Sequence, residues 1–248
     1  MSESARPVAA SDTTLLAVRD LNVYIGESHI LQGVSFGVRR GGITGLLGRN
    51  GVGKTTTLRG ILGLIARTGS VAVAGEETTR LATHEIVRRG VAYVPEDRDV
   101  FAGLTVEENL QLAERAGAPL RYDLVYELFP ELKQRAAQKA GTLSGGQQQM
   151  VALARALLNG DNTILLVDEP TKGLAPLVVR HVVDALRRAA EIATILLVEQ
   201  NLSVAHSLVK DVVVLDQGRV SFTGDVEQLM GDPALARRHL GLAAVGGH

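Results

Sequence analysis

The sequence of 248 residues contains no cysteine and no tryptophan, and aromatic residues make up only 3% of it. Without cysteine the chain can form neither disulfides nor thiolate metal sites, which fits a reducing cytoplasm. The scarcity of aromatic rings argues against binding of single-stranded nucleic acid by base stacking. The 26 basic and 27 acidic side chains nearly cancel, so the composition shows no basic footprint for nucleic acid.

Long apolar runs are also missing. Apolar runs such as residues 164–167 and 195–198 are far shorter than the ~20 residues that span a bilayer. Residues 1–14 are polar and rich in Ala and Ser, without the apolar centre of a signal peptide, and we predict a disordered lead-in there. A role at a membrane is therefore expected to come through partner chains.

The pattern of apolar residues predicts an α/β fold. Residues 15–38 alternate apolar and polar side chains between Gly breaks, as half-buried antiparallel strands do. Further strands are predicted at residues 43–47, 71–73, 91–94, 164–167, 195–198 and 212–215. Helices are predicted at residues 58–65, from Thr105, at 122–129, from Ser144 and at 178–190. Such alternation gives a mostly parallel sheet that is covered by helices on both faces.

The changes in composition along the chain also predict how it divides into domains. Residues 96–143 are charged, helical and rich in loops, and the strands return after them. We therefore predict a core at residues 15–95 and 159–224, an inserted helical subdomain at 96–158, and a C-terminal helical tail at 225–248.

A glycine-rich loop lies between a predicted strand and a predicted helix. It satisfies the pattern G-x-x-x-x-G-K-[ST], in which backbone N–H groups and a helix N-terminus surround phosphate oxygens. Lys54 would bind the β- and γ-phosphates, and the Thr55 hydroxyl would bind Mg²⁺. By chance the pattern arises in roughly one chain in a hundred of this length. The predicted ATP-binding residues here are Gly48, Arg49, Asn50, Gly51, Val52, Gly53, Lys54, Thr55 and Thr56.

Two adjacent carboxylates end the predicted strand at residues 164–167. Asp168 suits the coordination shell of Mg²⁺, and Glu169 suits a base that polarises the attacking water. The alternative is a solvated end of a strand, which acidic pairs more often are. The phosphate loop upstream favours the catalytic interpretation, so we predict a P-loop NTPase core.

A second helix start has the features of an anion site. Ser144 and Gln147 form an S-x-x-Q capping box, and Gly145 and Gly146 between them leave backbone N–H groups accessible. Within one chain a second anion site has no evident use. It makes sense if it closes over the γ-phosphate that another subunit holds.

In this order and spacing, residues 48–55, 143–147 and 164–169 resemble the ATP-binding cassette (ABC) family, over residues 15 to about 224. The resemblance implies a head-to-tail dimer with two ATP molecules at its interface, each bound by one subunit's phosphate loop and the other's residues 144–147. It also implies Mg²⁺ as the cofactor, permease subunits as partners, and a place at the cytoplasmic face of the plasma membrane.

Residues 93–98, 104–110, 173–176 and 197–201 look like the ATPase subunit of branched-chain amino-acid importers and their urea/amide relatives. This implies an ATPase that powers import, with an extracytoplasmic solute-binding protein as an indirect partner. The alternative is a non-transport ABC ATPase that acts as a switch on ribosomes or DNA. Those relatives carry tandem cassettes or a long coiled-coil insertion, and this chain has neither.

Several positions depart from the family pattern. Glu96 stands where a glutamine usually links Mg²⁺ to the membrane-domain contact, and it can still ligate a cation. Gln200 replaces the switch histidine, and its amide can orient water but cannot carry a proton. The usual adenine-stacking aromatic aligns with Ile25, so the neighbouring Tyr24 either stacks on adenine or is a core or surface residue. Ala175 removes a carboxylate that the family usually has after Glu169.

The remaining candidates are weaker. The six histidines show no metal-ligand spacing, and we interpret them as structural or surface residues. By the same resemblance, residues 101–112 form part of a groove that receives a cytoplasmic helix of the permease. The alternative is an ordinary helix of the subdomain.

Overall fold

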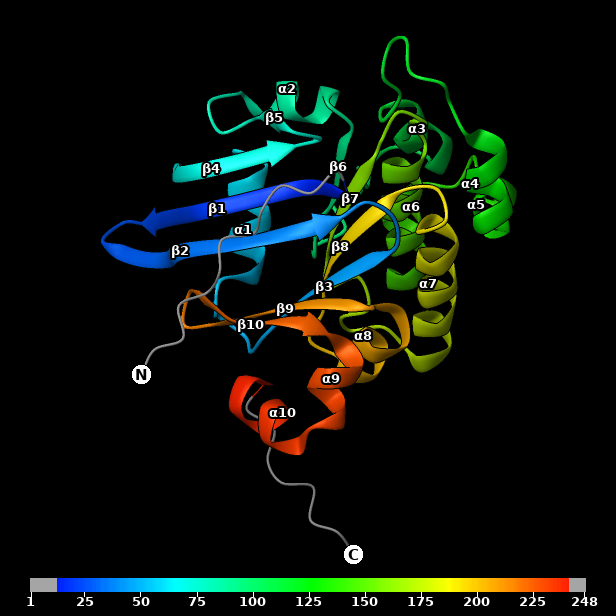
Figure 1. Ribbon diagram of the computed structural model, residues 1–248. Coiled ribbons are helices and arrows are strands. Elements are labelled where there is room, and N and C mark those ends of the chain that lie inside the picture. The colour runs from blue at the N-terminus through cyan, green and yellow to red at the C-terminus, as the bar shows by residue number, and fades with distance from the viewer. Residues whose placement is uncertain (1–12, 241–248) are drawn as a thin grey trace, which may run out of the picture.

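The computed structural model describes residues 13–240, so nearly all of the predicted lead-in and the last part of the predicted tail lie outside the described residues. The chain forms two β-sheets with helices around them (Figure 1). The strands are β1 (Thr14–Ile25), β2 (Ser28–Arg39), β3 (Ile43–Leu47), β4 (Arg67–Val73), β5 (Glu76–Glu77), β6 (Val91–Val94), β7 (Ile164–Asp168), β8 (Thr194–Val198), β9 (Asp211–Asp216) and β10 (Arg219–Asp225). The helices are α1 (Lys54–Ile61), α2 (Thr83–Arg88), α3 (Val106–Gln111), α4 (Tyr122–Leu128), α5 (Pro130–Gln134), α6 (Gly145–Leu157), α7 (Pro176–Ala189), α8 (Leu202–Leu208), α9 (Val226–Gly231) and α10 (Pro233–Leu240), with a 3₁₀ turn at Ala140–Thr142.

The larger sheet has the strand order β10-β9-β3-β8-β7-β6. The strands from β9 to β6 are parallel, and β10 pairs antiparallel with β9 at one edge. The predicted mostly parallel sheet is therefore confirmed, whereas β10 was missed. Because β3, β8, β7 and β6 are parallel neighbours, the loops that follow them meet at one edge, where ligands bind in open α/β sheets.

Both faces of this sheet are buried. Side chains alternate between the two faces along each strand, and every residue of β7 is buried. In β7, Leu165 and Val167 join the core that includes the apolar sides of α6 and α7. Ile164 and Leu166 join the core that includes α1, β1 and β2 on the other face. The apolar runs of the sequence thus come from a doubly covered sheet.

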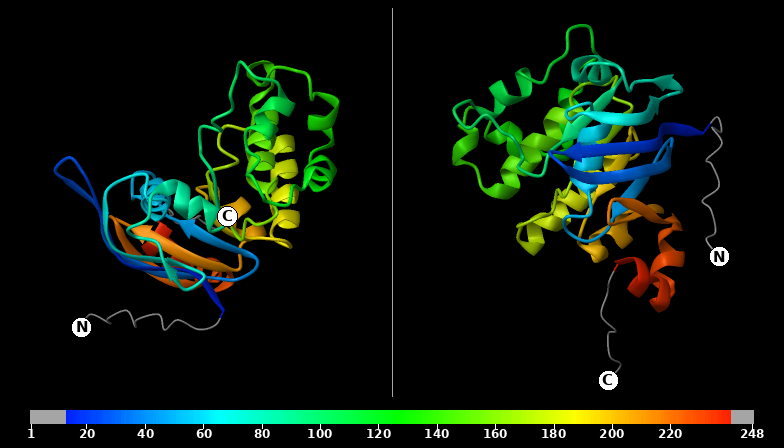
Figure 2. Two further views of the ribbon diagram at one scale, coloured as in Figure 1. Left: turned by 90° about the horizontal axis from the view of Figure 1, so that it is seen from above. Right: turned by 90° about the vertical axis from the view of Figure 1, so that its left-hand side faces the viewer.

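The second sheet, in the order β2-β1-β4-β5, is antiparallel. It confirms the antiparallel portion predicted at residues 15–38, although β1 already begins at Thr14. A helical group, α3 to α6, lies to one side of the two sheets, as the view from above shows (Figure 2). In the described part of the chain, no helix is long and apolar enough to cross a membrane.

The helix α1 ends earlier than its apolar spacing predicts. It ends at Ile61, because Gly63 adopts a left-handed φ of 71° that breaks the helical hydrogen bonds. The guanidinium of Arg67 donates to the carbonyls of Gly60 and Ile61, which satisfies acceptors at this end. Ile65 therefore lies beyond the helix, although it still packs against the core.

Candidate active site at the carboxyl edge of the parallel sheet

Four loops converge at the carboxyl edge of the larger sheet. They follow β3, β6, β7 and β8, and they carry respectively the phosphate loop (residues 48–55), Glu96, the pair Asp168 and Glu169, and Gln200. Every residue that we predicted to bind metal or to act in catalysis therefore comes from this one edge. Parallel pairing explains their meeting although they lie far apart in the chain.

The phosphate loop leads into α1 without a side-chain cap. Its N-cap residue, Gly53, has a φ of 107°, and no side chain accepts a hydrogen bond from the first turn. A Cβ atom on Gly53 would lie 2.6 Å from Cδ2 of Leu31, so both conformation and space require glycine. A helix start of this kind leaves N–H groups for an anion.

Lys54 is buried at the centre of this loop, with 5% of its surface exposed. Its ammonium donates to the carbonyl oxygens of Gly48 and Arg49, both at 3.0 Å. Its Nζ atom also lies 3.6 Å from Oε1 of Glu169. A buried positive charge is thus held between the open helix start and a carboxylate, which is where a phosphate group would find it.

Asp168 ends β7 and is fully buried. The pKa of its carboxyl is raised to about 6, mainly by burial and also by the charges of Glu169 and Glu96, whereas the hydroxyls of Thr55 and Tyr93 act to lower it. The Tyr93 hydroxyl lies 3.4 Å from Oδ2 of Asp168. The buried Oδ1 atom has no hydrogen-bond partner within residues 13–240.

The Oδ1 atom of Asp168, which has no hydrogen-bond partner in the part of the chain that the structure describes, is suited to bind a metal ion. Burial of a carboxylate oxygen without a hydrogen-bond donor costs free energy unless a cation binds to it. Among the residues that the structure describes, no group of three or more His, Cys, Asp or Glu side chains could hold a metal ion by itself. Such an arrangement suits Mg²⁺, which binds one or two carboxylates and takes its other ligands from phosphates and water.

Glu169 has a strained backbone, and its side chain lies between two positive charges. Its φ of 42° is left-handed, a conformation that costs a non-glycine residue about 1–3 kcal/mol and that clusters at functional sites. Its N–H donates to the carbonyl of Val198 at 2.9 Å, which ties the turn to the end of β8. Its side chain is buried between the ammonium groups of Lys54 and Lys172, at 3.6 and 3.7 Å.

Lys172 is a residue that sequence reasoning missed. Its ammonium pairs with Glu96 as well as with Glu169, and the hydrogen bond that it donates to Glu96 raises the pKa of this lysine. Glu96, predicted as a metal ligand, therefore forms an ion pair with a half-exposed lysine. The spacing of Lys172 three residues after Glu169 was the available signal, since i, i+3 neighbours meet in a helical turn.

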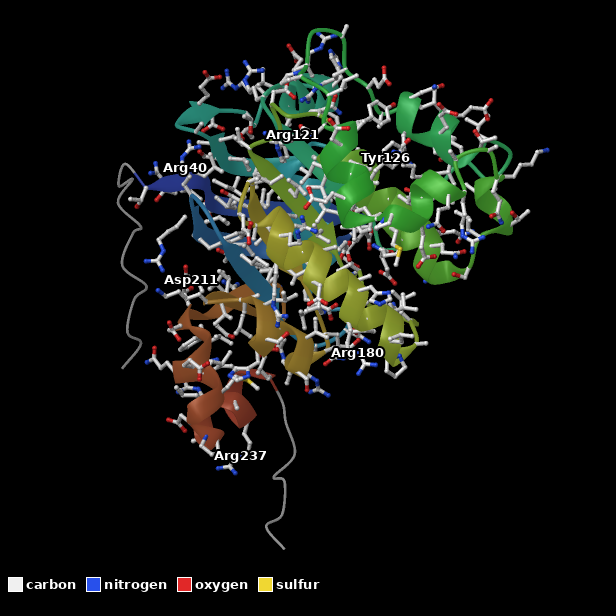
Figure 3. The ribbon with its side chains drawn as sticks, turned by 90° about the vertical axis from the view of Figure 1, so that its right-hand side faces the viewer. Arg40, Arg121, Tyr126, Arg180, Asp211 and Arg237 are labelled. Atoms are coloured by element: carbon white, nitrogen blue, oxygen red, sulfur yellow. The ribbon has the colours of Figure 1, made fainter. Side chains whose placement is uncertain are left out.

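Gln200 lies beside the phosphate loop. It lines a cavity of about 400 Å³ together with Gly48, Arg49 and Asn50. It also lines a larger cavity of about 880 Å³ that contains Glu169. Arg180 of α7 lies at this second cavity and points away from the helix into solvent (Figure 3).

The segment at the start of α6 forms the predicted capping box. The N–H of Gln147 donates to Oγ of Ser144 at 3.3 Å, and the N–H of Ser144 donates to Oε1 of Gln147 at 3.0 Å. Gly146 also has a packing reason to be glycine, because a Cβ there would lie 2.3 Å from Cγ1 of Val178 on α7. The structure therefore gives this segment a local role in addition to any role at a partner's site.

Tyr24 lies near the end of β1 and is 57% exposed. Its ring stacks on that of His29, the residue opposite in β2, with centroids 4.1 Å apart and planes at 9°. Of the alternatives left open by the sequence, a core position is therefore excluded. Ile25, where the family aromatic aligns, is exposed as well.

The fold and the site define the class of protein. Residues 31–172 match the family described as ABC transporter, and the chain belongs to this family. It is 40% identical to the high-affinity branched-chain amino acid transport ATP-binding protein BraG of Pseudomonas aeruginosa, over 92% of this chain and 100% of BraG. It is 39% identical to the probable branched-chain amino acid transport ATP-binding protein LivF of Archaeoglobus fulgidus, over 87% of this chain and 94% of LivF. A solved structure described as the ATP binding subunit of an ABC transporter shares 31% identity and a TM-score of 0.76, over 90% of this chain and 94% of that chain.

Proposed function

We propose that this chain binds and hydrolyses ATP to power an ABC importer for branched-chain amino acids or a related small polar solute such as urea or an amide. The observation that carries the proposal is the buried Lys54 between the open start of α1 and Glu169, 3.6 Å from the latter. The names of the two relatives above support the choice of solute. They lend no support to the alternative of a switch on ribosomes or DNA.

In this proposal the phosphate loop and Lys54 hold the phosphates of ATP, because N–H groups and an ammonium face the same space. Thr55 and Asp168 would hold Mg²⁺, with Glu96 as a further ligand once it leaves Lys172. When bound, Mg²⁺ would supply positive charge that offsets the charge developing on the transferred phosphoryl group. Glu169 accepts a proton from the attacking water, and Gln200 orients that water.

The site needs a second ATPase subunit, identical or different. Residues 144–147 would close over the ATP of that subunit, because Ser144, at the N-cap of α6, is exposed and the turn that it begins carries backbone N–H groups. Tyr24 and its stacked partner His29 offer an aromatic surface on which adenine could rest. The solute-binding protein acts only indirectly, through the permease.

The permease contact is proposed at a groove of about 360 Å³ beside the helical group. Leu64, 50% exposed, lines this groove. Phe101 is 48% exposed, and its ring centroid lies 5.0 Å from the guanidinium carbon of Arg155, another lining residue. An apolar groove with a cationic edge suits a cytoplasmic helix of a permease, which would hold the chain at the inner face of the membrane.

The hydrolysis proposal is tested with Glu169→Gln. Removal of the base should lower turnover of Mg²⁺–ATP by about a hundredfold or more, while ATP affinity stays within about twofold because Lys54 and Asp168 remain. Turnover by phosphate release and affinity by equilibrium titration would be measured on the full-length chain. Wild-type turnover in this variant would refute the role of Glu169, and absence of any Mg²⁺-dependent hydrolysis in the assembled transporter would refute the function.

The docking proposal is tested by Phe101→Asp and Leu104→Asp. Neither residue lines the groove itself, but Phe101 lies at its edge, against the lining residue Arg155. A charge at this apolar edge should lower co-purification with the permease subunits while ATP affinity is retained. Ile192→Asp, at an exposed apolar residue in the turn between α7 and β8, is the matched control. Unchanged assembly and solute uptake in folded variants would leave residues 101–112 as an ordinary part of the subdomain.

A further inference from the structure

A buried carboxylate lies directly before Gln200, and the proposed mechanism does not use it. Glu199 follows the last residue of β8 and is 2% exposed. Burial raises the pKa of its carboxyl, so its presence here has an energetic cost. It lines the cavity of about 880 Å³ that also contains Glu169 and Gln200.

The two oxygens of Glu199 bind two different loops. Oε2 accepts hydrogen bonds from the N–H groups of Gln200 and Asn201, both at 3.0 Å. Oε1 accepts a short hydrogen bond from the hydroxyl of Thr171, a buried residue two positions after Glu169. One side chain therefore fixes the turn after β8 and joins it to the turn after β7.

This link is reinforced by the backbone. The N–H of Glu169 donates to the carbonyl of Val198, so the two turns are connected at two points. The Thr171 bond needs the hydroxyl, whereas the two backbone bonds would form a tight turn without it. Because Oε1 is buried it needs a donor in any case, and the donor that satisfies it comes from the loop that carries Glu169.

We propose that Glu199, through Thr171, is a positioning residue that fixes Gln200 relative to Glu169. The proposal rests on the proposed ATPase function. It adds to that function the contact that aligns the amide of Gln200 with the base Glu169. A shift of about 1 Å in such groups can lower a rate by up to about a hundredfold without loss of substrate binding. The link therefore acts on the chemical step more than on the affinity for ATP.

The primary variants are Thr171→Val and Thr171→Ser. Valine removes the hydroxyl and keeps the side-chain shape, so kcat of ATP hydrolysis should fall about tenfold while KM changes less than about twofold. Serine keeps the hydroxyl and should retain most of the wild-type kcat. A loss of fold alone would lower the amount of active protein without this difference between valine and serine.

Glu199→Ala and Glu199→Gln complete the test. Alanine removes all three hydrogen bonds and should lower kcat at least as much as Thr171→Val. Glutamine can accept from both N–H groups through its oxygen and donate to the Thr171 hydroxyl through its amide nitrogen, so it should retain more activity than alanine. Glu191→Gln, at an exposed glutamate, is the matched control.

The double variant Thr171→Val/Glu199→Ala decides whether the two residues act as one unit. If they do, the double variant should be no slower than Glu199→Ala alone. Losses that multiply, or a wild-type kcat in Thr171→Val, would overturn the proposal even when Glu169→Gln is inactive as expected. Absence of hydrolysis by the wild-type chain in the assembled transporter would instead refute the proposed function itself.

Discussion

The helices α1 and α6 both begin at a glycine-rich segment, but their starts are built differently. The N-cap of α1 is Gly53, left-handed and without a side-chain cap. The N-cap of α6 is Ser144, extended and closed by a capping box with Gln147. At the start of α1 the side chain of Lys54 is buried, whereas Ser144 at the start of α6 is exposed.

The difference indicates how much of each site is complete within one chain. The start of α1 has its cation and its carboxylates in place, so it can bind an anion alone. At α6 two N–H groups are already satisfied by the capping box. The guanidinium of Arg98 lies beside Gly145, and the carboxylate of Glu131 accepts a hydrogen bond from the Gln147 amide. We therefore expect α1 to determine nucleotide affinity and α6 to act only when a second subunit supplies the phosphate.

The largest effect is expected at α1. Lys54→Ala removes the buried ammonium, so ATP affinity of the isolated chain should fall by about tenfold to a hundredfold, the size of a lost charged hydrogen bond. Equilibrium titration with ATP would measure it, with Lys210→Ala, at an exposed lysine, as the matched control. An unchanged affinity would mean that the start of α1 does not hold the phosphates.

The opposite pattern is expected at α6. Ser144→Arg should leave ATP affinity of the isolated chain within about twofold, but it should lower dimer-dependent turnover at least about tenfold, because a bulky cation blocks the facing phosphate. Turnover would be measured in the assembled transporter, since the chain by itself need not form the active pair. A large loss of monomer affinity would place Ser144 in its own subunit's pocket and remove the contrast with α1.

A third prediction separates packing from function at the start of α6. Gly146→Ala should lower the free energy of unfolding by about 1–3 kcal/mol, because the added Cβ would overlap Val178. The double variant Gly146→Ala/Val178→Ala should recover part of that loss. Gly145→Ala, whose Cβ would meet only the flexible end of Arg98, is the control. Urea unfolding would measure all three, and equal stability of both glycine variants would contradict the packing role.

The sequence predicted the parts of the fold that depend on local chemistry. The strand at residues 164–167, the capping box at Ser144 and the cap at Thr105 are visible because period, cap and turn residues are local signals. The helix α8 was missed because it is short and its stability comes from packing. The strand β10 was missed because it lies at the edge of the sheet and has no fully buried side chain among Arg219–Asp225. The end of α1 was placed too late because apolar spacing continues past Gly63, where the backbone cannot remain helical.

The site was predicted less completely than the fold. Motifs identified Lys54, Asp168 and Glu169, and parallel pairing brings their loops to one edge. Lys172 was missed although it lies only three residues after its partner Glu169. The Thr171 partner of Glu199 lies in another loop, and no spacing along the chain reveals such a pair. Glu199 did give a signal of the kind that revealed Asp168, a charged residue directly after a buried strand.

The smallest predicted effect tests whether the Ser144 hydroxyl serves its own helix or the partner's phosphate. Ser144→Ala removes the acceptor for the N–H of Gln147, so the free energy of unfolding should fall by about 1 kcal/mol, and Ser144→Gly should cost only a few tenths. Urea unfolding would measure both, alongside turnover in the assembled transporter. If the hydroxyl also binds the facing phosphate, alanine and glycine should lower turnover equally despite their different stabilities. Turnover that follows stability would instead assign the hydroxyl to the cap, and the anion site at α6 would then consist of backbone N–H groups alone.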